Sequence, residues 1–169
     1  MGATNYQEAR HLIARAHALA EVGHPPETIA DILGIDPDTL ARYLETRGVP
    51  SADRVRYLWA REIAEQIAAG NPPDVPDRWW EHGSCRSAGN PDAWFPVGAP
   101  DPAVIRTCDA CPVQTACLTV ALTRPERDGV WGGITHRHLL SLHRRIQRIR
   151  MHRRGYRARP WHSKREGAA

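Results

Sequence analysis

The sequence predicts a mostly α-helical protein with a helix-turn-helix-like N-terminal domain, a small helical domain containing four cysteines, and a basic C-terminal tail. Three observations support this fold class. Apolar residues recur at helical spacing through the first 70 residues, with no alternating strand pattern. All four cysteines lie between residues 85 and 117, and arginines are concentrated after residue 135. The chain is therefore expected to divide into residues 1–70, a linker at 71–76, the cysteine domain at 77–140, and a basic helix and tail at 141–169.

The first 70 residues are expected to form four helices. The first ends at Gly23, and the second extends from Pro26 to Leu33, with Gly34 as its C-terminal stop. The third begins at residue 37, where a proline follows an aspartate N-cap, and it ends before residues 48–50. Ser51 can cap the fourth helix.

Residues 26–47 resemble a helix-turn-helix, a motif whose second helix can enter the major groove of DNA. The small side chain of Ala30 suits a helix crossing, and Gly34 suits the turn. Arg42 and Arg47 are then expected to be exposed and to contact DNA. Because this segment also carries many acids, a helical bundle that binds protein, or binds nothing, is the alternative.

Charge is divided unevenly along the chain, whose net charge is +4. Residues 135–169 contain ten Arg, one Lys and the single acid Glu166, a net charge of +10. Residues 1–134 contain 12 basic and 18 acidic residues, a net charge of −6. A basic tail of this kind is typical of proteins that bind a polyanion, although a solvated tail without a partner has the same composition.

The expected location of the chain decides how its cysteines are interpreted. No apolar run approaches the roughly 18 residues of a membrane span, and the N-terminus lacks the pattern of a secretory signal. We therefore expect a cytoplasmic protein without membrane contact. Thiols stay reduced in the cytoplasm, so four clustered cysteines indicate metal binding more than disulfides.

The spacing of the cysteines narrows the kind of metal site. Cys85 is followed after 22 residues by Cys108, after two more by Cys111, and after five more by Cys117. Structural zinc sites usually use two short cysteine pairs, and only one such pair is present. Three cysteines in one stretch and one distant cysteine fit a 4Fe–4S cluster better, with zinc, disulfides and free thiols as alternatives. Pro112 is expected to begin the helix that contains Cys117.

The segments around the cysteines carry a specific set of motifs. They are Trp-Trp-Glu-His-Gly-Ser-Cys at 79–85, Asp-Ala-Trp-Phe-Pro at 92–96, Cys-Asp-Ala-Cys-Pro-Val-Gln-Thr-Ala-Cys-Leu at 108–118, and Gly-Val-Trp-Gly-Gly at 129–133. In this order they resemble the WhiB-like family of regulators from actinobacteria and their phages, over about residues 78–140. The resemblance implies a 4Fe–4S cluster on the four cysteines. It also implies contact with the C-terminal domain of the principal sigma factor within RNA polymerase, at an interface that includes Gly129, Val130, Trp131, Gly132 and Gly133.

Aromatic side chains near the cysteines have two interpretations. Trp131 lies on a glycine-rich turn that can present its indole as an exposed binding anchor. Trp80 and Phe95 can join that interface or shield the cluster from water. Ordinary core packing is the alternative for each of them.

The basic tail is expected to combine a helix with an extended segment. Leu139, Leu142, Ile146 and Ile149 form a narrow apolar stripe at helical spacing. Residues 153–160 are similar to an AT-hook, which lies in a narrow minor groove, except that Ala158 replaces the central glycine. The predicted contacts with double-stranded DNA in this region are Arg144, Arg145, Arg148, Arg153, Arg154, Arg157 and Arg159.

The predicted function is regulation of transcription through simultaneous contact with sigma factor and promoter DNA. We expect no enzyme, because no nucleophile–base pair or paired carboxylates with a surrounding motif are found. One alternative is a thiol–disulfide redox protein that uses the Cys108/Cys111 pair, although no thioredoxin-like order of strands and helices surrounds it. Another is a sigma-factor-binding inhibitor of phage origin, which needs no promoter preference.

Overall fold

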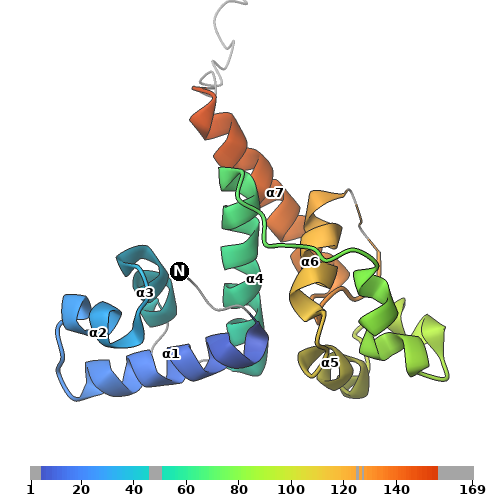
Figure 1. Cartoon of the computed structure of the whole chain (residues 1–169), viewed down its shortest axis with the longest axis horizontal. Helices are drawn as coiled ribbons and strands as arrows, with labels where there is room; N and C mark the ends of the chain where they lie inside the picture. Colours follow the sequence, from blue (N-terminus) through green and yellow to red (C-terminus); the bar gives the residue numbers. More distant parts are fainter. Residues whose placement is uncertain (1–4, 46–50, 125, 127, 156–169) are drawn as a thin grey trace, which may run out of the picture.

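The computed structural model describes residues 5–45, 51–124, 126 and 128–155. Within these residues the chain forms seven α-helices and three short 3-10 helices, and its only strand-like pairing is one bridge between Trp131 and Ile134. Figure 1 shows how the α-helices are arranged. The predicted mostly α fold is confirmed. None of the described helices is long and apolar enough to cross a membrane.

The N-terminal part contains the four predicted helices. They are α1 (Tyr6–Glu21), α2 (Pro26–Leu33), α3 (Pro37–Leu44) and α4 (Ala52–Ala69). The predicted caps are present, since the Asp36 carboxylate accepts the backbone N–H of Thr39, and the Ser51 hydroxyl accepts that of Arg54. Each bond satisfies an amide that has no partner inside its helix. The expected end of the third helix at residues 48–50 lies outside the described residues.

The C-terminal part begins with three 3-10 helices, η1 (Trp79–His82), η2 (Ser84–Ser87) and η3 (Pro91–Trp94). They are followed by α5 (Pro102–Asp109), α6 (Gln114–Thr123) and the basic helix α7 (His136–Arg153). The prediction that Pro112 begins the helix containing Cys117 is wrong, because α6 begins two residues later. Residues 111–114 instead form a turn closed by a bond from Gln114 N–H to the Cys111 carbonyl.

The centre of the molecule is α4, which lies between the N-terminal helices and the pair α6 and α7 (Figure 1). Trp59 on this helix is fully buried, in a core that includes residues of α1 to α4, α6 and α7. The apolar stripe of α7 is confirmed: Leu139, Leu142 and Ile146 are buried against this core, and Ile149 is partly buried. The two helical parts thus share one core, while the predicted domain boundaries stay a prediction.

Candidate functional site

The four cysteines are contributed by three helices and one turn. Cys85 lies on η2 and is exposed, whereas Cys108, near the end of α5, is buried. Cys111 lies in the turn between α5 and α6, and Cys117 lies on α6; both are half-buried. Cys108 packs with Val104 and Val130 in a small core that is separate from the main core.

The four thiols are close enough to interact electrostatically. The pKa of Cys117 is raised to about 12, mainly by burial and to a smaller extent by the charges of Cys108, Cys85 and Cys111. Burial and then Cys111 raise the pKa of Cys85, which comes from a distant part of the sequence. The fold therefore brings Cys85 into the neighbourhood of the other three cysteines.

Several N–H groups lie near the cysteine sulfurs. Burial raises the pKa of Cys108, and the neighbouring Trp94 indole and Gly133 amide partly oppose that rise. The Trp94 indole nitrogen is buried and has no hydrogen-bond partner of regular geometry among the described residues. The Gly132 amide lowers the pKa of Cys117 in the same way, against the larger effect of burial. The Ser84 amide donates to the Cys111 sulfur at 3.4 Å.

The glycine-rich segment 129–133 forms a tight turn beside the cysteines. Reciprocal backbone bonds between Trp131 and Ile134, of 3.0 and 2.9 Å, close it. Gly129, Gly132 and Gly133 all have positive φ, a conformation that L side chains rarely adopt. A Cβ on Gly132 would lie 2.9 Å from the Gln114 carbonyl oxygen, so the turn also needs close backbone approach.

The predicted sigma-factor interface residues fall into two groups. Val130 is buried. Trp131 is half-buried rather than exposed as predicted, because it packs against the main core. Its indole N–H donates to the Asp128 carbonyl at 2.8 Å. Phe95 is 61% exposed and Trp80 is 52% exposed. A Cβ on Gly129 would lie 2.9 Å from the Phe95 ring, so the structure brings Phe95 and the turn together.

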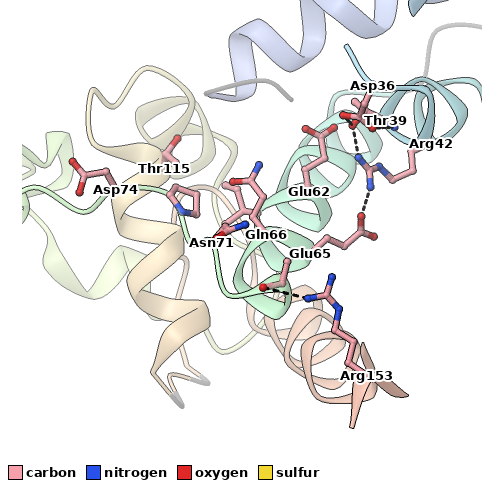
Figure 2. Close-up of a pocket in the computed structure, with 13 residues that line it drawn as sticks. Asp36, Thr39, Arg42, Glu62, Glu65, Gln66, Asn71, Asp74, Thr115 and Arg153 are labelled. Atoms are coloured by element: carbon pink, nitrogen blue, oxygen red, sulfur yellow. Dashed lines mark hydrogen bonds and ion pairs between the residues drawn. The ribbon is translucent and has the colours of Figure 1, made fainter. Parts of the chain in front are cut away.

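Several predicted DNA-binding arginines are used inside the fold. Arg42 is half-buried rather than exposed, and its guanidinium pairs with Glu65 of α4 and bonds to Thr39 (Figure 2). Arg145 pairs with the same carboxylate. Arg153 donates to the Ala69 carbonyl at the end of α4, at 3.2 Å (Figure 2).

Other arginines of α7 face solvent. Arg144 and Arg148, and Arg154 at the C-cap of the helix, are exposed and form no ion pair with the residues that the structure describes. Arg137 shares these properties, lies seven residues before Arg144 and so falls on the same face of the helix. The sequence analysis missed Arg137, although its spacing from Arg144 and Arg148 was a usable signal. Arg47, Arg157 and Arg159 lie outside the described residues.

The ligand geometry bears on which group the cysteines can hold. Across the described part of the chain, no three His, Cys, Asp or Glu side chains meet closely enough to bind a single metal ion. The four thiols nevertheless influence one another, and N–H donors surround them. The four cysteines can therefore supply thiolate ligands from one region of the fold.

Comparison with known proteins identifies the family. The model of the family described as "Transcription factor WhiB" matches residues 79–141. The transcriptional regulator WhiB2 of Mycolicibacterium smegmatis is 38% identical over 76 residues, which are 44% of this chain and 58% of that protein. The transcriptional regulator WhiB1 of Mycobacterium tuberculosis is 36% identical over 77 residues, which are 42% of this chain and 92% of that protein.

A third relative extends the comparison to another genus. The transcriptional regulator WhiB of Streptomyces coelicolor is 37% identical over 77 residues, which are 45% of this chain and 86% of that protein. No solved structure matches the chain. The family match includes all four cysteines and the glycine-rich turn, whereas α1 to α4 precede it. The chain therefore belongs to the WhiB family of transcription factors.

Proposed function

We propose that this chain is a cytoplasmic transcription regulator that binds a 4Fe–4S cluster and contacts both the principal sigma factor and promoter DNA. The observation that supports the cluster most directly is the set of N–H groups near the sulfurs. The Ser84 amide donates to the Cys111 sulfur at 3.4 Å, and the Gly133 and Gly132 amides lower the pKa of Cys108 and Cys117 against the larger effect of burial. Hydrogen bonds to sulfur stabilise thiolate ligands and tune the potential of iron–sulfur clusters.

The unligated thiols are poorly suited to other chemistry. Burial raises the pKa of Cys108 and raises that of Cys117 to about 12, so free thiolates are disfavoured at neutral pH. A cationic metal can replace the protons and compensate the buried charge. The redox alternative needs a reactive thiolate in the Cys108/Cys111 pair, and a raised Cys108 pKa opposes it.

A cluster also fits the spacing better than zinc does. Four sulfurs bound at about 2.3 Å to one zinc lie about 3.8 Å apart, which would form a tight ligand group. Among the described residues, no three or more His, Cys, Asp or Glu side chains are grouped so that they could hold one metal ion. In a 4Fe–4S cluster each cysteine binds its own iron, which spreads the sulfurs. When bound, this cluster can exchange an electron with partners.

Anaerobic purification followed by absorption spectroscopy and iron and sulfide analysis tests the cofactor. We expect about four iron and four sulfide per chain. Cys85→Ser, which changes the ligand farthest away in the sequence, should lower the iron content, whereas Ser87→Ala on the same 3-10 helix should not. One zinc per chain and no sulfide would refute the cluster.

The proposed sigma-factor contact is the surface where Phe95 meets the turn at 129–133. This surface combines the exposed Phe95 ring with the half-buried Trp131 indole and Gly129, whereas Gly132 and Gly133 of the predicted interface are buried. Aromatic side chains of this kind are typical anchors of protein-binding surfaces. Trp80 can extend the same interface from η1. A pull-down with the isolated C-terminal domain of the principal sigma factor tests this contact.

The proposed DNA contact is the outward face of α7. Arg137, Arg144 and Arg148 lie on this face and are free to meet phosphates. Arg42 and Arg145 can contribute only after they leave Glu65. A sigma-binding inhibitor would need no such face, so loss of the three free arginines separates the two functions: only a DNA-binding regulator should lose promoter binding.

A further inference from the structure

We propose that Arg56 of α4 is a positioning residue for the cysteine site, and that it acts through Asp109 and Gly133. The inference rests on the proposed cluster-binding function. Arg56 lies outside residues 79–141, the part of the chain that matches the family.

Arg56 forms a two-pronged ion pair with Asp109 across the molecule. Its Nε donates to one carboxylate oxygen at 2.8 Å and its Nη2 to the other at 2.7 Å. Its Nη1 donates to Asp53 at 2.7 Å. The Arg56 side chain is only 5% exposed, so the pair is protected from water.

Asp109 is well placed to transmit this contact to the cysteines. It directly follows Cys108 and precedes Cys111 by two residues, inside the Cys-x-x-Cys segment. Its carbonyl also accepts the Gln7 side-chain amide of α1 at 3.4 Å. Asp109, which lies between Cys108 and Cys111, is therefore held by α1 through its backbone carbonyl and by α4 through its side chain.

The second route from Arg56 runs through the glycine-rich turn. A Cβ on Gly133 would lie 2.9 Å from Arg56 Cδ and 3.1 Å from its Nε, so the arginine packs directly on this glycine. The Gly133 amide lies close enough to Cys108 to lower the pKa of its thiol, against the larger effect of burial. Arg56 thus contacts both Asp109, the residue after Cys108, and Gly133, whose amide lies near the Cys108 sulfur.

A neighbouring chain of contacts reaches Cys117. The Arg56 guanidinium lies 4.8 Å from the Tyr6 ring centroid, and the Tyr6 amide donates to Gln114 Oε1 at 3.4 Å. Gln114 Nε2 donates to the Gly132 carbonyl at 3.0 Å, and the Gly132 amide lies close enough to Cys117 to lower the pKa of its thiol. Tyr6 and Gln114 are both buried, so this chain of contacts is fixed by packing.

The charges make the role of Arg56 measurable. Removing the Arg56 cation leaves the Asp109 carboxylate uncompensated beside the cluster, which favours the oxidised cluster. Neutralising Asp109 leaves extra positive charge, which favours the reduced cluster. Arg56→Met should therefore lower the reduction potential, and Asp109→Asn should raise it. General loosening of the fold would shift both potentials in the same direction.

The test uses anaerobically purified full-length protein loaded with its cluster. Iron release to a chelator and the reduction potential are measured for Arg56→Met, Asp109→Asn and the matched control Arg61→Met. Arg61 lies on the same helix but pairs with Glu45 and Glu65, away from the cysteines. Iron release should be at least about tenfold faster in Arg56→Met, the effect typical of residues that orient metal ligands, and unchanged in the control.

Arg56→Lys provides a second variant if Arg56→Met does not fold, as judged by circular dichroism. It keeps the charge and loses the two-pronged geometry, so the potential should stay near wild type while iron release accelerates. The proposal would be overturned if Arg56→Met and Arg61→Met had equal rates of iron release and equal reduction potentials. It would also be overturned if the reduction potential shifted in the same direction in Arg56→Met and Asp109→Asn. Absence of a cluster in the wild-type protein would instead refute the proposed function itself, and this inference with it.

Discussion

The outward face of α7 gives a quantitative prediction for DNA binding. Arg137, Arg144 and Arg148 are exposed on one face, and each can neutralise one phosphate. Each neutralised phosphate adds about 0.9 to the steepness of the plot of log affinity against log salt. Changing all three to Gln should therefore reduce that slope by about 2.7, and should weaken binding most at low salt.

Fluorescence anisotropy with one promoter duplex, repeated over a salt series, measures the slope directly. Arg145→Gln is the control, because Arg145 lies on the same helix but pairs with Glu65. We expect the control to change the slope little. An unchanged slope in the triple variant, or an equal change per residue in the control, would refute the assignment of the DNA-binding face.

Three further predictions concern the cysteine site and its surroundings. Trp131→Ala should abolish capture of the sigma-factor domain while the absorbance of the cluster persists; loss of both together would make Trp131 a core residue only. Gly132→Ala should destabilise the fold by at least about 1 kcal/mol in a denaturant titration, because φ is +58° and the new Cβ would lie 2.9 Å from the Gln114 carbonyl. In the cluster-free protein at mildly alkaline pH, Cys85 should be alkylated before Cys117, as measured by mass spectrometry. Cys85 is exposed, whereas burial raises the pKa of Cys117 to about 12. The reverse order would contradict the described geometry.

The N-terminal helices were predictable because their boundaries are set locally. Asp36 and Ser51 cap helices in the structure as their positions in the sequence predict. Such signals act over three or four residues and need no tertiary contact. The start of α6 was predicted wrongly at Pro112, because the turn between Cys111 and Gln114 depends on how the chain passes the cysteine site.

The role of each arginine could not be derived from composition. Arg144 and Arg145 are adjacent and chemically identical, yet one faces solvent and the other pairs with Glu65 of α4. Arg42 suits a recognition helix in the sequence, but the packing of α3 beside α4 brings it to the same carboxylate (Figure 2). Which arginine is free depends on the acids that distant helices bring near it.

The sequence by itself determined the helical fold, the family and the four cysteines, because helical periodicity, caps and motif spacing are all written within short segments. Only the tertiary structure decided that α4 packs against the cysteine part and that Arg56 reaches Asp109. These two residues are 53 positions apart. Their pairing depends on how α4 and α5 are packed, and no local pattern in either helix encodes that arrangement.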